Sequence, residues 1–186
     1  MKSALYVYLV SLLLWGTRQV AYAQFTSPEP LKKSFTRSQW QIGLKDGYGR
    51  GDLLRNHTDF QAHMGYYLVN KLLVGIGASW SKEWEGGFKF NDFTAGPLAR
   101  YQFTRTRFSP FIQASYQLGE RSTGRNSGIS YPSVSTQFAF ITPGLSIGVA
   151  SSLRIDISYG FQYLINGYTT VYGQPQFGIN YLFGVN

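Results

Sequence analysis

The chain has 186 residues, of which 44% are hydrophobic, 17% aromatic and only 14% charged, with 21 glycines and no cysteine. Abundant aromatic residues and few charges exclude a disordered chain, and the length suits one domain. The lack of cysteine excludes disulfides, cysteine-based zinc sites and cysteine nucleophiles. The net charge of +8 admits an anionic partner such as nucleic acid or lipid headgroups.

The first 23 residues have the features of a secretory signal peptide. Lys2 precedes an apolar run at 4–15, and Ala21-Tyr22-Ala23 forms a small-x-small cleavage site. We expect cleavage after Ala23, because the run is shorter than the ~20 residues that a retained anchor helix would need. Cleavage removes two of the 17 basic residues and none of the nine acidic ones, leaving a net charge of +6. An exported protein does not meet the genome, so we expect no nucleic-acid partner.

The rest of the chain alternates between apolar and small or polar residues with a period of two, which is the period of a β-strand. No helical period persists. In the second segment, for example, Phe60 and Met64 belong to the apolar set, and Asp59 and His63 belong to the polar set. We count eight such segments, at about 39–45, 57–69, 72–82, 93–103, 109–118, 137–149, 153–163 and 176–185.

The polar set indicates which side of the sheet faces solvent. It consists mainly of Gly, Ser, Thr, Gln and Asn with few charges, whereas a soluble β-protein carries many charged residues on its outer face. If the apolar set instead meets lipid, the small polar set fills a narrow lumen. Only a closed barrel then satisfies the backbone in hydrocarbon. The sequence therefore predicts an all-β fold, an eight-stranded antiparallel up-and-down transmembrane β-barrel over 38–186. A soluble lipocalin-like barrel is the alternative.

The connections between segments alternate between short and long. The short ones are at 70–71, 105–109 and 150–152, and the long ones are at about 46–56, 83–91, 119–136 and 166–174. Bacterial barrels have short periplasmic turns and long outer loops, so we expect both termini in the periplasm. Aromatic residues of the apolar set gather near both ends of the segments, as interfacial girdles require. The predicted girdle is Trp40, Phe60, Tyr66, Trp80, Phe93, Tyr101, Tyr163, Phe177, Tyr181 and Phe183.

Four stretches resemble the small outer-membrane β-barrel proteins of Gram-negative bacteria, the OmpX-like and OmpA-transmembrane-domain-like group. They are NKLLVGIGASW, SPFIQASYQLG, PGLSIGVASSLRIDISYGFQY and QFGINYLFG. The resemblance covers 38–186 and implies a place in the bacterial outer membrane, with phospholipid, lipopolysaccharide and the barrel assembly machinery as partners. Members of the family usually end on an aromatic residue, whereas Phe183 is followed here by three further residues.

Six titratable residues of the polar set are predicted to face the lumen. Buried charges persist when they are paired and hydrogen-bonded, so we expect two ionic plugs, one toward each end of the barrel. In this scheme Arg100, Arg154 and Asp156 lie toward the periplasm, and Lys45 and Asp59 lie toward the outside. A switchable ion gate in a narrow porin-like channel is the alternative. The predicted lumen charge network is Lys45, Asp59, His63, Arg100, Arg154 and Asp156.

Signals for catalysis or metal binding are weak. Lipid A-modifying barrel enzymes of this kind need a nucleophilic serine and a histidine at the outer rim. His57 could join Asp59 in a relay, but no serine is tied to them by spacing. His57, Asp59 and His63 would spread over about 20 Å of strand, too far for one metal ion. We therefore expect no enzyme activity, cofactor or metal.

The external loops carry the remaining candidates. Arg50-Gly51-Asp52 matches an integrin-binding tripeptide, although three residues often match by chance. The longest loop, 120–136, contains Arg121, Arg125 and Tyr131, and we expect it to be a contact surface.

Basic residues gather on the predicted periplasmic side, where phospholipid phosphates could meet them. The segment 24–37 is expected to be a periplasmic leader without regular structure. The basic residues are Lys32, Lys33, Arg37, Lys71, Arg105 and Arg107.

These features together predict a function for the chain. We expect a monomeric outer-membrane barrel with a side-chain-filled lumen, acting through external loops in adhesion or envelope interaction, or in envelope integrity.

Overall fold

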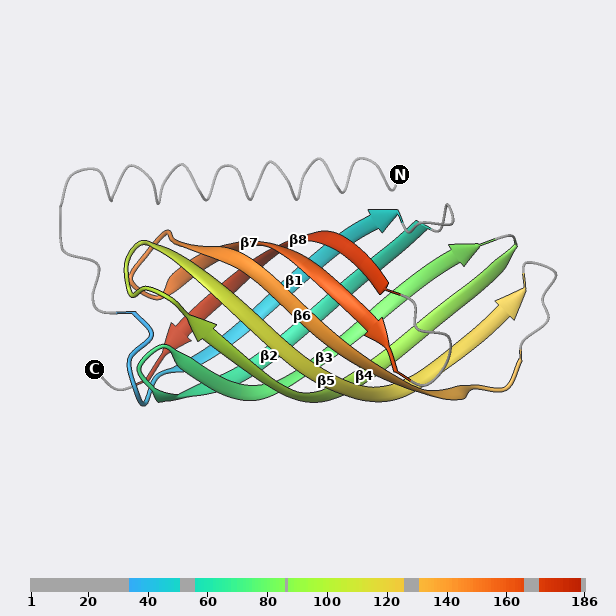
Figure 1. The fold of residues 1–186 in the computed structure, drawn as a ribbon, viewed down its shortest axis with the longest axis horizontal. Coiled ribbons are helices and arrows are strands. Elements are labelled where there is room, and N and C mark those ends of the chain that lie inside the picture. The colour runs from blue at the N-terminus through green and yellow to red at the C-terminus, as the bar shows by residue number, and fades with distance from the viewer. Residues whose placement is uncertain (1–33, 51–55, 86, 126–130, 166–170, 185–186) are drawn as a thin grey trace, which may run out of the picture. The chain divides into compact units, whose positions relative to one another are not determined.

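The computed structural model describes residues 34–50, 56–85, 87–125, 131–165 and 171–184. Its eight strands form one closed barrel in which each strand is antiparallel to both neighbours, and β1 pairs with β8 (Figure 1). This arrangement confirms the predicted fold class. The strands are β1 Trp40–Arg50, β2 Asn56–Val69, β3 Leu72–Glu85, β4 Phe88–Gln102, β5 Phe108–Arg125, β6 Val134–Gly148, β7 Leu153–Leu164 and β8 Val171–Phe183.

Side chains alternate between the lumen and the outside, because successive residues of a pleated strand point to opposite faces; an irregularity at 67–69 of β2 interrupts the alternation. On β1, Leu44 is 53% exposed and the next residue, Lys45, is 1% exposed. On β4, Arg100 and Gln102 are buried and Tyr101 between them is exposed. The barrel is therefore apolar outside and polar inside, the reverse of a soluble protein.

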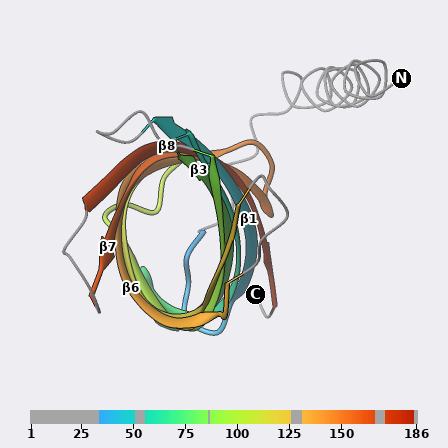
Figure 2. The same cartoon turned by 90° about the vertical axis from the view of Figure 1, so that its right-hand side faces the viewer.

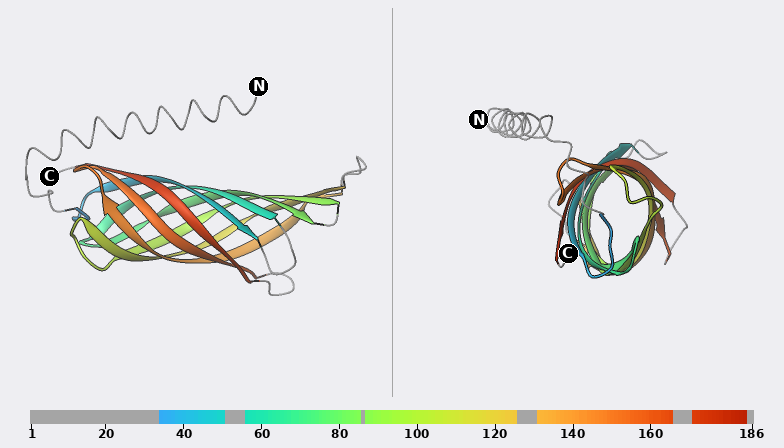
Figure 3. Two further views of the ribbon diagram at one scale, coloured as in Figure 1. Left: turned by 90° about the horizontal axis from the view of Figure 1, so that it is seen from above. Right: turned by 90° about the vertical axis from the view of Figure 1, so that its left-hand side faces the viewer.

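The two ends of the barrel differ. At one end, here called the turn end, the strands are joined through residues 70–71, 103–107 and 149–152, and β1 begins and β8 ends there. The opposite end, called the loop end, has the connections at 51–55, 86–87, 126–133 and 165–170. The strands run obliquely around the barrel, as the left view of Figure 3 shows.

The strands extend further into the loop end than the sequence predicted. β3 and β4 stay paired up to Glu85 and Phe88, and β5 continues for 18 residues to Arg125. The expected loops at 83–91 and 119–136 are therefore wrong in extent, because the backbone ladder continues through polar residues that carry no lipid-facing pattern. The β3–β4 and β5–β6 hairpins project well beyond β7 and β8 (Figure 1).

The end of the predicted leader lies inside the turn end. Ser34 and Phe35 are buried, and the segment crosses the barrel mouth when the barrel is viewed along its axis (Figure 2). Backbone hydrogen bonds hold this segment: the Lys71 amide donates to the Phe35 carbonyl at 2.9 Å, and the Ser38 amide donates to the Tyr67 carbonyl at 3.0 Å. The expected boundary between leader and barrel, at residue 38, therefore separates Phe35 from the barrel residues against which it packs.

The residues of the predicted girdle all belong to the outward set of their strands. Most are exposed, while Tyr66 and Tyr163 are half-buried beside neighbouring side chains. Trp40 and Tyr66 pack edge to face at 5.1 Å, and Tyr101 and Phe103 do so at 5.4 Å, both at the turn end. In the parts of the chain that the structure describes, no helix is long and apolar enough to cross a membrane.

Candidate functional site in the lumen

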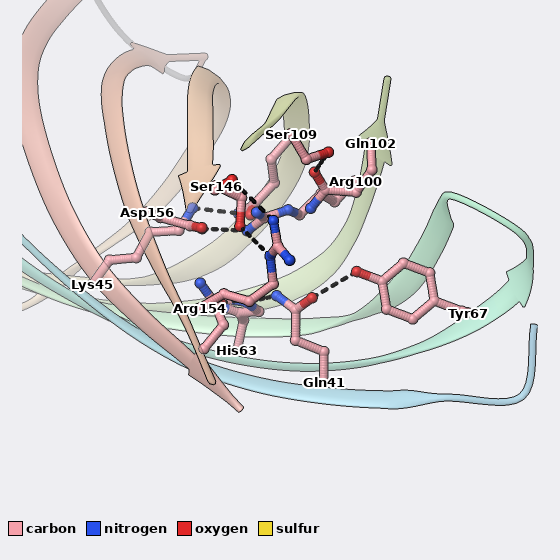
Figure 4. A network of polar contacts seen from close by, with 12 residues as sticks. Gln41, Lys45, His63, Tyr67, Arg100, Gln102, Ser109, Ser146, Arg154 and Asp156 are labelled. Atoms are coloured by element: carbon pink, nitrogen blue, oxygen red, sulfur yellow. Dashed lines mark hydrogen bonds and ion pairs between the residues drawn. The ribbon is translucent and has the colours of Figure 1, made fainter. Parts of the chain in front are cut away.

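A buried ion pair lies in the lumen toward the turn end, as the sequence predicted for these two residues. Arg100 on β4 donates through Nη1 to Asp156 Oδ2 on β7 at 2.5 Å, and both side chains are fully buried. The Arg100 guanidinium also stacks on the Phe111 ring at 3.6 Å. With the Gln102 amide oriented so that its oxygen faces the guanidinium, Arg100 Nε and Nη2 donate to that oxygen at 2.8 and 2.9 Å. The charge is thus paired, stacked and hydrogen-bonded, as burial requires (Figure 4).

A chain of amides and hydroxyls continues from this pair around the wall. Tyr67 donates to Gln41 Oε1 at 2.7 Å, and Gln41 Nε2 lies 2.8 Å from Asn180 Oδ1 and 3.1 Å from His63 Nε2 (Figure 4). Lys45 donates to Gln113 Oε1 at 2.9 Å. His63 and Lys45 therefore each contact a neutral glutamine side chain, Gln41 and Gln113 respectively.

Gly43 makes this close packing possible. A Cβ atom at this position would lie 2.2 Å from both Asn180 Oδ1 and His63 Cε1. Because real Cβ atoms do not approach so closely, the His63 and Asn180 side chains need a glycine beneath them.

Arg154 closes the network toward the turn end, and among the described residues no carboxylate lies in hydrogen-bond contact with it. Its Nη2 donates to the carbonyls of Thr106, Arg107 and Ser146 at 3.0–3.1 Å, and its Nε donates to Ser146 Oγ at 3.0 Å. Phe35 covers the guanidinium with its ring at 4.4 Å. Arg154 therefore fastens the 103–107 turn to the lumen, in a position that the sequence assigned to an ionic plug.

Asp59 lies toward the loop end and is held by amides. Gln61 Nε2, Gln174 Nε2 and Gln176 Nε2 approach its Oδ2 at 2.5, 3.0 and 3.4 Å. The expected Lys45–Asp59 pair is absent among the described residues, because Lys45 turns to Gln113 and the glutamines of β8 reach Asp59 instead. The outer ionic plug was thus placed on the wrong residues.

The ionic cluster of the loop end is instead built around Arg121. Its Nε and Nη2 contact Asp92 Oδ1 and Oδ2 at 2.7 and 2.9 Å, and Glu83 Oε2 lies 3.9 Å from Nη2. The sequence placed Arg121 in an external loop, which is wrong, because β5 continues past this residue and directs it inward opposite Asp92. The alternation of the sequence, extended to residue 92, places Asp92 on the lumen face of β4. This was the signal that could have revealed the cluster.

The other predicted contact residues have different positions. Arg125 ends β5 and is exposed, with its guanidinium 5.6 Å from the Phe88 ring, and Tyr131 is exposed. Arg50 ends β1, whereas Gly51 and Asp52 lie outside the described residues.

The candidate relay and metal residues contact other side chains in the lumen. His57, Asp59 and His63 all face the lumen, but Asp59 binds glutamines and His63 contacts Gln41. Across the described ranges, no group of three His, Cys, Asp or Glu side chains is arranged to hold a metal ion.

The comparisons with known proteins support the fold alone. No protein-family model matches the chain, and no curated protein matches it. The N-terminal β-barrel domain of OprF from Pseudomonas aeruginosa superposes with a TM-score of 0.59 at 15% identity, over 79% of this chain and 98% of that one. Neisserial surface protein A superposes with a TM-score of 0.60 at 20% identity, over 77% and 95%. The chain therefore has the eight-stranded β-barrel fold found in outer-membrane proteins of this kind.

Proposed function

We propose that the chain is an integral barrel of the bacterial outer membrane that does not conduct solutes and acts through its external end. The role of that end would be adhesion, envelope interaction or envelope integrity. The observation that carries the proposal is that inward-facing side chains at several levels of the lumen are buried and bonded to one another. An eight-stranded barrel is just wide enough for such filling.

Three layers block the lumen. Phe35 and Arg154 cover the turn end, Arg100, Asp156 and Phe111 form the next layer inward, and Arg121 with Asp92 lies near the loop end. The Arg100–Asp156 pair reaches from β4 to β7, and the Arg121 guanidinium on β5 contacts Asp92 and Glu83 on the neighbouring wall. These layers speak against the narrow-channel alternative, because a solute would have to break buried ion pairs to pass.

The turn end is the better candidate for the periplasmic side. Its connections are short, and β1 begins and β8 ends there. Arg37, Arg105 and Arg107 lie at the same end. Arg105 is partly engaged, since its Nε donates to the Ser34 carbonyl at 3.2 Å. The loop end would then be external, and its projecting β3–β4 and β5–β6 hairpins would present exposed Trp84, Arg125 and Tyr131 to a partner.

The experiment is to refold the chain in detergent, compare boiled and unboiled samples by gel mobility, and record planar-bilayer conductance. We expect a heat-modifiable band and no discrete current steps. Current steps whose size changes in Arg100→Ala or Asp156→Ala variants would contradict the closed lumen and favour a channel. A soluble chain without heat-modifiability would contradict membrane insertion altogether. Unchanged lipid A in cells that lack the gene would separately set aside the lipid-modifying enzyme.

A further inference from the structure

The outward face of the barrel carries an apolar groove that no part of the proposed function uses. It has a volume of about 960 Å³ and extends over β8, β1, β2, β3 and β4. Ile76 is 68% exposed, and Leu44 and Phe177 are each 53% exposed, so the groove opens away from the lumen. Its size lies within the range of small-molecule sites, roughly 300–1,000 Å³.

The strand register explains the shape of the groove. Ala62, Ala78 and Ala95 are direct partners on β2, β3 and β4 and form one row of small side chains. Bulky rows lie on both sides of this row in the same register. On the loop side the row is Phe60, Trp80 and Phe93, and on the turn side it is Met64, Ile76 and Pro97. The alanine row is therefore a recess between two raised rows, wide enough for a hydrocarbon chain.

Two lysines lie beyond the aromatic row on the same strands. Lys82 follows Trp80 on the outward face of β3, with its Nζ 4.5 Å from the Trp80 ring, and Lys89 is the partner of Trp84. Among the described residues, neither lysine has an ion-pair partner. Two cations beside tryptophans at the boundary of an apolar face match the headgroup level of a membrane, where anionic phosphates lie.

The acidic residues near the groove restrict where an anion can bind. Asp46 borders the groove on β1 beside Phe60, and Glu120 on β5 is the partner of Phe93. Both would repel a phosphate, so the favourable position is over β3 and the adjoining end of β4, where the lysines lie. Lys82 is four residues from Ala78, about 13 Å along the strand. That separation fits a lipid with its phosphate at the lysines and an acyl chain in the recess.

We propose that the outward face of β3 and β4 binds one phosphorylated membrane lipid, with its phosphate on Lys82 and Lys89 and an acyl chain over Ala62, Ala78 and Ala95. The proposal rests on insertion of the barrel in lipid, and it is independent of whether the lumen conducts.

Native mass spectrometry of the refolded chain in an uncharged detergent tests this site. The probes are phosphatidic acid and the diacylglycerol with the same acyl chains, which differ only in the phosphate. We expect the protein to retain one phosphatidic acid at least tenfold more tightly than diacylglycerol. The double variant Lys82→Ala/Lys89→Ala should abolish this difference. The control Arg37→Ala/Arg107→Ala, which removes two exposed charges at the turn end, should preserve it.

A second pair of variants tests the recess. Ala78→Phe should weaken retention of both lipids, whereas Ala114→Phe, on the outward face of β5 away from the groove, should leave retention unchanged. Heat-modifiability checks that each variant folds, and Lys82→Gln/Lys89→Gln replaces the alanine variant if that one does not. Failure of the wild-type chain to show heat-modifiability would instead count against the barrel proposal itself.

Several outcomes would overturn the lipid site. If the lysine variant and the arginine control retained phosphatidic acid equally well, the proposed contact between the phosphate and the two lysines would be wrong. Full competition by millimolar inorganic phosphate would indicate a simple anion site that does not recognise lipid. A wild-type dimer that Ala78→Phe converts to a monomer would make the groove an interface between copies of this chain.

Discussion

Arg100 and Asp156 show how single residues determine the inside of this barrel. Each is charged and fully buried, and Phe111 of the neighbouring strand β5 stacks on the Arg100 guanidinium. Removing one member of such a pair leaves the other buried without compensation, which costs far more than the pair itself contributes.

We therefore expect Asp156→Asn to lower the free energy of unfolding by about 3–5 kcal/mol. The double variant Arg100→Met/Asp156→Leu should recover most of this loss, because an apolar pair of similar volume leaves no buried charge. The measurement is urea unfolding of the chain refolded in lipid vesicles. Glu120→Gln, at an exposed carboxylate on β5, should stay within about 0.5 kcal/mol of the wild type. An unchanged urea midpoint of unfolding for Asp156→Asn would contradict this expectation, and would mean that water solvates Arg100 and Asp156.

The segment 34–38 is the element whose role is the least visible in the sequence. Phe35 and Ser38 have φ angles of 61° and 72°, which residues with side chains rarely adopt. Such conformations cost about 1–3 kcal/mol each and persist only where surrounding contacts stabilise them. Here the stabilising contacts are the hydrogen bonds to Tyr67 and Lys71 and the packing of the Phe35 ring against Tyr67 at 5.6 Å.

Phe35→Ala should therefore release this segment from the turn end. The loss of a buried ring costs about 3 kcal/mol, which corresponds to roughly a 100-fold rise in the detached population. The rate of trypsin cleavage after Arg37, followed by mass spectrometry, measures this population. Phe108→Ala serves as the control, because Phe108 is an exposed phenylalanine at the same end. Equal cleavage rates in the two variants would show that Phe35 does not anchor the segment.

At the scale of the whole molecule, the barrel exposes an apolar belt that would aggregate in water. In lipid the belt is solvated, so the cost of a charged residue there depends on depth and not on exposure alone. Ile76 lies near the middle of the belt, between the two girdles, and Val134 begins β6 beyond the belt at the loop end.

Ile76→Lys should destabilise the barrel in lipid vesicles by about 2–4 kcal/mol, and Val134→Lys by no more than about 1 kcal/mol. Both residues are more than half exposed, so a water-soluble protein would tolerate the two changes alike. Urea unfolding in vesicles gives both values. Similar small effects would argue that Ile76 does not face hydrocarbon.

The sequence by itself determined the eight strands, their parity and the inside-out character of the barrel. Those features are local, because a period of two assigns each side chain to a face before any strand has a partner. It follows that Lys45, Asp59, His63, Arg100, Arg154 and Asp156 could be placed on the polar face from the sequence.

Only the tertiary structure decided which of these residues meet. Asp156 pairs with Arg100, which lies three strands away. Asp59 accepts a hydrogen bond from Gln174 of β8, and Arg121 faces the lumen opposite Asp92. Burial of Phe35 and the row of alanines on β2, β3 and β4 likewise depend on contacts between distant segments. Such pairings follow from the register and closure of the barrel, and no single strand carries that information in its own pattern.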